Sequence, residues 1–299
     1  MDRITNVAMN ATVIGTTQRT LARLATYQQQ LASGKKVNEV SDDPVGAKTA
    51  MRYSGEKFAT GKYLNNIDSG AAFMTATDSS LSEMSQLMDQ IKEVAVQGAN
   101  GTQDASSRKV LAQSLDSYLS RMVDLANTVH DGRFIFAGTS TTQDEPPFAR
   151  SADGATVTYG GNLDTFSVNV GPNSPVTLNQ DGYNLFMKGT DLFKTVIDVR
   201  DALNANDGDK VNSLITNVDA ASSRVNELHG AMGGRIQRLE LARNQLEDSQ
   251  VYLGSLISGI EDVDMTEAIS KLQLNQVALE AGLQAGTRVL QPTLMDFLR

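Results

Sequence analysis

The segment Glu261-Asp262-Val263-Asp264-Met265-Thr266-Glu267 opens the stretch on which the fold depends, residues 260–299. Asp264 is suited to accept hydrogen bonds from the free N–H groups of a first helical turn, and Glu267 is suited to reach back to the cap. Apolar residues then recur at alternating steps of three and four, the heptad spacing of a coiled-coil seam. The seam comprises Met265, Ile269, Leu272, Leu279, Leu283 and Leu290, with Gln276 and Gly286 as weak positions. Because so narrow a stripe forms no core alone, the sequence predicts a partner helix.

The beginning of the chain carries the matching pattern. Val7, Ile14, Leu21, Leu24 and Leu31 follow a heptad register between polar residues, so the first and last helices are expected to pair. The C-terminal helix also has a second apolar line, formed by Leu274, Val277, Ala278, Ala281 and Ala285. A helix that is apolar on two sides requires more than one neighbour. We therefore predict that these helices form an assembly seam between molecules; the alternative is a covered hairpin within one chain.

The assembly seam is expected to extend beyond the last helix. Pro292 ends that helix, because proline lacks the N–H that a continuing helix needs. Leu294 and Phe297 follow it and are expected to form a separate apolar hook.

Between its two ends the chain is predicted to be mainly α-helical. Gly34 ends the first helix, and Asp43 with Pro44 begins a second that runs to about residue 98. A return helix follows over about 106–129, and helices resume near residue 191 and continue to about 260. In the last of these, a stutter in the heptads at Gly230, Gly233 and Gly234 predicts local unwinding.

Residues 133–190 form a small all-β insert between the long helices. This segment is rich in glycine and proline, and strands are predicted at 156–159, 166–170, 176–178 and 183–186. The fold class is therefore a long antiparallel helical bundle or coiled coil, built from both chain ends, with a β insert. The predicted domains are the N-terminal helix of an inner coiled coil (1–40), the two halves of the long bundle (41–132 and 191–260), the outer insert (133–190) and the C-terminal helix of the coiled coil (261–299).

Composition narrows the function classes. A net charge of −9 gives no basic stripe to neutralise phosphates, so we expect no nucleic acid partner. No apolar run reaches the ~20 residues of a membrane span, and the N-terminus lacks the pattern of a cleaved signal peptide. The chain has no cysteine and only two histidines, His130 and His229, and it contains no catalytic or phosphate-binding motif. We predict that it is not an enzyme and has no catalytic residue, cofactor or metal site.

Two segments carry a family resemblance. Ser33-Gly34-Lys35-Lys36-Val37-Asn38, followed by Ser41-Asp42-Asp43-Pro44-Val45-Gly46-Ala47, resembles the N-terminal signature of bacterial flagellins and their relatives. The ending, from Glu261 through Ala278-Leu279-Glu280-Ala281 to Leu298-Arg299, resembles their C-terminal signature. The resemblance covers about 1–145 and 190–299. Within the family, residues 132–139 and 294–298 look like the proteins of the hook–filament junction more than like the filament subunits.

The resemblance implies a structural subunit of the bacterial flagellum at the junction between hook and filament. Such a subunit is extracellular, is exported through the flagellar type III channel, and assembles through its paired terminal helices. The partners implied are copies of itself in a ring, another hook-associated junction protein, flagellin, and an export chaperone on the C-terminal helix. Two alternatives stay open: filament flagellin, and a secreted coiled-coil tip or effector protein of a related type III system.

Overall fold

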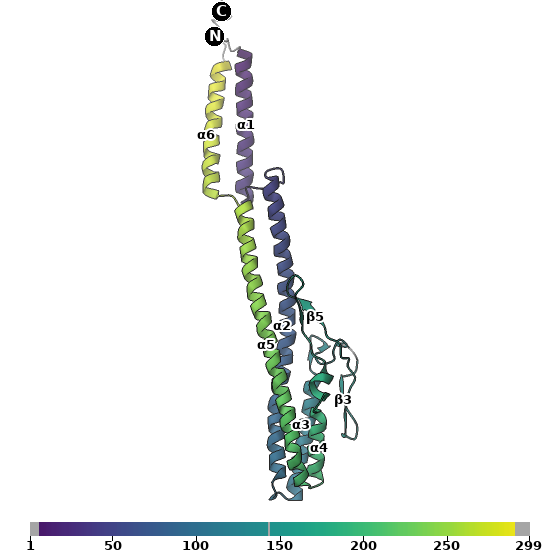
Figure 1. The fold of residues 1–299 in the computed structure, drawn as a ribbon. Helices are drawn as coiled ribbons and strands as arrows, with labels where there is room; N and C mark the ends of the chain where they lie inside the picture. Colours follow the sequence, from purple (N-terminus) through teal and green to yellow (C-terminus); the bar gives the residue numbers. More distant parts are fainter. Residues whose placement is uncertain (1–5, 143, 291–299) are drawn as a thin grey trace, which may run out of the picture. The chain divides into compact units, whose positions relative to one another are not determined.

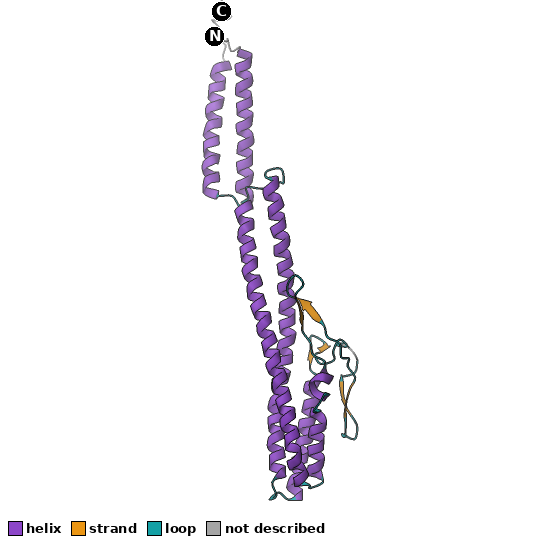
Figure 2. Cartoon of the chain, viewed as in Figure 1, coloured by secondary structure: helices purple, strands orange, loops and turns teal. Residues whose placement is uncertain are grey.

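Long α-helices make up most of the protein, as the heptad pattern predicts. The structure is a computed structural model that describes residues 6–142 and 144–290. Figure 1 shows the helices in chain order, and Figure 2 shows that strands occur only between α3 and α4. The helices are α1 (Asn6–Ser33), α2 (Pro44–Ala99), α3 (Ala105–Ala126), α4 (Leu192–Asn204), α5 (Gly208–Glu261) and α6 (Met265–Leu290).

Caps confirm the predicted end of α1 and the predicted starts of α2 and α6, whereas α3 ends at Ala126, three residues before its predicted end. Gly34 has a positive φ of 73°, the left-handed conformation that ends α1 at little steric cost. The Asp43 carboxylate accepts from the backbone N–H of Gly46 at 2.9 Å and so caps α2, whose first residue is Pro44. The Asp264 carboxylate accepts from the N–H groups of the residues two and three positions later, at 2.9 and 3.1 Å, as expected for the start of α6.

The chain divides into two compact units. Unit 1 comprises Met1–Ala59 and Ser249–Arg299 and holds α1, α6, the first part of α2 and the last part of α5. Unit 2 comprises Thr60–Asp248 and holds the rest of α2 and α5, together with α3, α4 and every strand of the described residues.

Unit 2 has its own hydrophobic core. Figure 1 shows α3 and α4 lying beside α2 and α5, and the predicted apolar lines of the long helices meet there. Each buried leucine or methionine contributes roughly 1.5–3 kcal/mol relative to an exposed one, so this core stabilises unit 2 by itself. Its fully buried side chains include Leu81, Met84 and Met88 of α2, Leu115, Leu119 and Met122 of α3, Val196 and Val199 of α4, and Val218 and Val225 of α5.

The insert consists of three short antiparallel hairpins. They pair β1 (Val129–His130) with β2 (Arg133–Phe134), β3 (Phe148–Arg150) with β4 (Val157–Tyr159), and β5 (Ser167–Asn169) with β6 (Pro175–Thr177). The predicted strands at 156–159, 166–170 and 176–178 are thus confirmed to within about a residue or two.

One prediction in this region is wrong. The segment 183–186 is not a strand but part of η1 (Tyr183–Met187), a π-helical turn. Its adjacent residues Leu185 and Phe186 are both buried, and a short apolar run of this kind does not distinguish strand from helix. The helix α5 runs through Gly230, Gly233 and Gly234 without a break, and the local unwinding of the supercoil at this stutter stays a prediction.

Aromatic rings hold the insert on the helices. Phe148 of β3 packs against Phe193 of α4 with ring centroids 5.4 Å apart, and against Phe186 at 5.7 Å. Leu178 lies over Gly70 of α2, where a Cβ would come within 2.8 Å of the leucine Cδ2. Gly70 on the α2 seam is therefore explained by the close approach of the insert.

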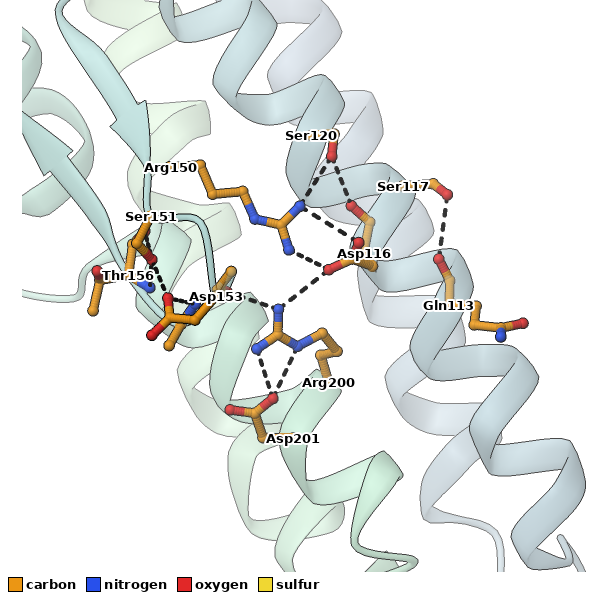
Figure 3. Close-up of polar contacts among 12 residues, drawn as sticks. Gln113, Asp116, Ser117, Ser120, Arg150, Ser151, Asp153, Thr156, Arg200 and Asp201 are labelled. Carbon is orange, nitrogen blue, oxygen red and sulfur yellow. Dashed lines mark hydrogen bonds and ion pairs between the residues drawn. The ribbon is translucent and has the colours of Figure 1, made fainter.

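A charged clamp ties the β3–β4 hairpin to α3 and α4 (Figure 3). The carboxylate of Asp116 on α3 binds the guanidinium groups of Arg150, on β3, and Arg200, on α4. Arg200 also pairs with Asp201 at 2.7 Å and donates to the carbonyl of Gly154 at 2.8 Å. The Arg150 hydrogen bond is the main reason that the pKa of Asp116 lies below its ordinary value.

Candidate assembly site

The end of α1 and the start of α6 are joined by hydrogen bonds within unit 1. The N–H of Lys36 donates to the carbonyl of Glu261 at 2.7 Å, and the N–H of Val263 donates to the carbonyl of Gly34 at 3.0 Å. The Lys35 ammonium lies 2.5 Å from the Glu261 carboxylate, a hydrogen bond that raises the pKa of Lys35. These contacts place the bases of the two terminal helices side by side, a junction that the sequence pattern did not reveal.

The loop before α2 is fixed in the same region. The Asp42 carboxylate accepts from the N–H groups of Asn38 and Glu39, both at 2.9 Å, and these bonds lower its pKa. Asp42 and Asp43 therefore serve the backbone of this loop and of α2.

The terminal helices α1 and α6 pack along each other in unit 1 (Figure 1). Four predicted seam residues are half-buried: Leu24, Leu31, Leu272 and Leu279. Ala268 is buried, and a Cβ on Gly286 would come within 3.0 Å of the Val13 Cγ1, so this glycine allows a close approach of the helices. Gly286, a weak position of the heptad pattern, is thus a contact residue.

The remaining seam residues with described side chains are exposed. Ile14 and Leu21 on α1 are 57% and 49% exposed, and Ile269 and Leu283 on α6 are 44% and 53% exposed. The second apolar line of α6 is exposed as well, at Leu274 and Val277. The sequence predicted a single seam, but the structure divides it into two lines. One line packs between α1 and α6, and the other consists of apolar side chains exposed to solvent.

Some of the predicted residues fall outside this description. The backbones of Val7 and Leu290 belong to α1 and α6, but their side chains are not described, and Leu294 and Phe297 lie outside the described residues.

Unit 1 exposes further apolar side chains that the seam prediction did not include. Val45, Met51 and Phe58 on α2 and Val251 and Tyr252 on α5 are all more than 60% exposed. Among the described residues, most exposed large apolar side chains belong to unit 1, although unit 2 is the larger unit. A concentration of this kind marks a surface that another molecule covers.

No group of three or more His, Asp or Glu side chains in 6–142 and 144–290 is arranged to hold a metal ion. Within the same residues, none of the helices has the length and hydropathy of a membrane span.

Comparison with known proteins shows which family the chain resembles. The bacterial flagellin N-terminal helical region matches residues 4–141, and the bacterial flagellin C-terminal helical region matches residues 215–298. The flagellar hook-associated protein 3 of Escherichia coli is 24% identical over 286 residues, which span 87% of this chain and 88% of that protein. Flagellin FlaB1 of Treponema pallidum is 24% identical over 259 residues, 85% of this chain and 84% of that protein.

A solved structure shares the fold. The flagellar junction protein FlgL from Legionella pneumophila superposes with a TM-score of 0.61 at 15% identity, and the match covers 72% of this chain and all of that one.

Proposed function

This chain belongs to the flagellin family, and we propose on that basis that it is a structural subunit of the bacterial flagellum, forming the junction between hook and filament. The observation that carries the proposal is the pair of terminal helices, which match the two flagellin regions and expose apolar side chains beyond those they cover in each other. The names of the similar proteins support the junction in particular, because a hook-associated protein and a flagellar junction protein are among them.

Assembly follows from burial of this surface. Burying apolar area is favourable by roughly 25 cal/mol per Å², so exposed lines on α1 and α6 stabilise any arrangement in which neighbouring copies cover them. We assign the α1–α6 pair to the half-buried leucines. We assign the assembly seam to the exposed residues Ile14, Leu21, Ile269 and Leu283, and we keep in it the residues predicted from the sequence alone, Val7, Leu290, Leu294 and Phe297. In the monomer, the described residues of this seam are exposed to solvent.

The partners we propose are other copies in a ring, a second hook-associated protein on one side and flagellin on the other. Before assembly, an export chaperone would cover the exposed line of α6, since an uncovered apolar helix invites premature association. Export through the flagellar type III channel, an extracellular place in the flagellum and the absence of an enzymatic role belong to the same proposal. The predicted division into an inner coiled coil, a long bundle and an outer insert also stays a proposal.

Deletion of the gene tests the function. We expect cells with hooks but without filaments, and flagellin released into the medium, because filament growth has no junction to start from. Restoring the gene should restore filaments. Normal filaments on the deletion strain would overturn the proposal.

Filament flagellin is the second candidate, favoured by the equal identity of the Treponema flagellin. Purified protein added to filament seeds separates the two. A filament subunit elongates the seeds into long filaments, whereas a junction subunit does not.

A further inference from the structure

A pocket lined by cationic side chains lies in unit 2. A cavity of about 330 Å³ opens between α5 and the end of the insert, lined by Arg224 and Arg235 of α5 and by Thr177, Asn179 and Asp181. A second cavity of about 630 Å³ adjoins it, shares Arg224 and adds Lys188 and Glu227. Two arginines and a lysine therefore line these two neighbouring cavities, in a chain whose net charge is −9.

Arg235 has no carboxylate partner among the described residues. With the Gln180 amide turned so that its oxygen faces the guanidinium, that oxygen accepts from both Nη atoms at 2.8 and 3.2 Å. Burial, followed by the positive charge of Arg238, lowers the pKa of Arg235. A half-buried guanidinium that faces an amide and a second cation is an incomplete charge pair.

Arg224 is similarly under-satisfied. Its Nε is buried without a hydrogen-bond partner in the described residues, and its two Nη contacts, to the Asn184 carbonyl and the Glu227 carboxylate, are both long at 3.4 Å. Asp181 is the buried carboxylate of the pocket, but it accepts from the N–H and the side-chain amide of Asn184, both at 2.7 Å. The two cavities thus retain guanidinium donors without strong acceptors, and these donors suit the carboxylates of another molecule.

We propose that this pocket receives the carboxylates of Asp144 and Glu145 from a neighbouring copy of the chain. The inference rests on the proposed function, because a closed ring of identical subunits needs two different, complementary surfaces on each copy. Asp144 and Glu145 are exposed and make no ion pair with any described residue, whereas the other adjacent acidic pair of unit 2, Glu247-Asp248, is engaged by Arg243 through its glutamate.

The chemistry of the acidic pair suits this role. Pro146 and Pro147 follow it directly, and each proline fixes φ near −65°, so the pair is carried on a stiff stretch and loses little entropy on binding. Copies with a net charge of −9 repel one another in general. A local attraction between opposite charges therefore determines where two copies first meet and how they align with each other.

Charge exchange provides the first test, in cells in which the wild-type gene restores filaments to the deletion strain. Arg235→Glu and the double variant Asp144→Lys/Glu145→Lys should each reduce filaments per cell by about tenfold, and the chain carrying all three changes should recover most of that loss. Lys109→Glu, an exposed charge reversal on α3, is the control and should have no effect. Normal filament numbers with Arg235→Glu, or no recovery in the combined chain, would overturn the proposal.

Cysteine cross-linking provides a second test that does not depend on the folding of the arginine variants. The chain has no cysteine of its own, so a Thr177→Cys/Glu145→Cys variant reports only on the introduced pair. Mild oxidation of isolated flagella should give a ladder of disulfide-linked copies, and a Val110→Cys/Glu145→Cys control should not. Flagella that form normally yet give no ladder would overturn this contact and leave the junction function standing. A deletion strain with normal filaments would instead contradict the function itself.

Discussion

Arg108 closes one end of the helical core of unit 2, although its charge is buried to 7% exposure. Its Nε donates to the carbonyl of Gly98 at 2.9 Å, and its Nη atoms donate to the carbonyl of Asn100 at 3.1 Å and to the side-chain oxygen of Asn206 at 2.6 Å. One guanidinium thus ties the α2–α3 turn to the α4–α5 turn. Gly208 leaves room for it, because a Cβ there would lie 2.6 Å from an Nη atom.

Replacement of Arg108 should therefore destabilise unit 2 strongly. Arg108→Ala removes these charged hydrogen bonds and takes away the donor that Arg108 supplies to the carbonyl of the buried Gly98, which costs on the order of 2–4 kcal/mol of unfolding free energy. Urea unfolding followed by circular dichroism measures the change. Lys109→Ala, the exposed neighbour on the same helix, should stay within about 0.5 kcal/mol of wild type. Equal stability of the two variants would show that the hydrogen bonds of Arg108 do not hold the two turns together.

Asp116 predicts a pH-dependent contribution to stability. Its pKa is lowered chiefly by Arg150, so its contribution is complete above the ordinary carboxyl pKa of about 3.9 and disappears as the pH falls through the lowered value. Because the Asp116 side chain is 47% exposed, solvent screens the clamp, and Asp116→Asn should cost only on the order of 1 kcal/mol. The difference from wild type should be constant from pH 7 to about pH 4 and shrink below that.

Urea unfolding of both proteins at several pH values tests this. Asp124→Asn, an exposed carboxylate on α3 outside the clamp, serves as the control and should match wild type throughout. A difference for Asp116→Asn that grows below pH 4 would have the wrong sign for this mechanism.

At the scale of the helices and strands, the sequence pattern predicted those features that are determined by residues close together in the chain. The heptad spacing gave the long helices and the buried face of α2, and Asp43, Pro44 and Asp264 marked helix starts through bonds within one turn. Contacts between distant residues left no such signal. Lys35 with Glu261, and the Asp116 clamp, join residues separated by whole helices, so neither could be predicted from spacing alone.

The candidate site was predicted in the same partial way. The heptads placed apolar residues on α1 and α6, but a period does not say which of two adjacent lines a partner covers. The packing decides that: Leu24 and Leu279 are half-buried in the pair, whereas Ile14 and Leu283 remain exposed. The strand β3 was missed because three residues after Pro146-Pro147 show no alternation of apolar and polar positions.

Two methionines on α2 allow the effect of a core substitution to be compared with that of a surface substitution on the same helix. Met88 is fully buried in unit 2, and Met51 is 65% exposed in unit 1. Met88→Ala should lower the unfolding free energy by about 2–5 kcal/mol through lost burial and a cavity, and Met51→Ala by less than about 0.5 kcal/mol. Thermal or urea unfolding measures both. Met51→Ala should instead reduce filament formation in cells, and an unaltered filament count would remove Met51 from the assembly surface.

At the scale of the whole molecule, fold and assembly are separate properties. Unit 2 buries a complete core, whereas unit 1 holds its helices together through a narrow line and exposes many apolar side chains. A domain that buries little of its apolar surface is ordered mainly by what binds it, and local opening is easiest where few apolar contacts must break. Substitutions in unit 1 should therefore affect flagella more than they affect the stability of unit 2.

Leu279 and Leu283 divide this role between two adjacent lines on α6. Leu279→Asp places a charge in the half-buried α1–α6 contact, and Leu283→Asp places one on the exposed line. Both should abolish filaments, because each removes a surface that assembly needs, while the unfolding free energy of unit 2 stays unchanged.

Hydrogen exchange of the monomer separates the two variants. Amides of 8–33 and 265–287 should exchange faster in Leu279→Asp and at the wild-type rate in Leu283→Asp. Leu241→Asp, at an exposed leucine of unit 2, is the control and should leave filaments intact. If Leu283→Asp assembled normally, the exposed line of α6 would have no part in the junction, whatever Leu279→Asp did.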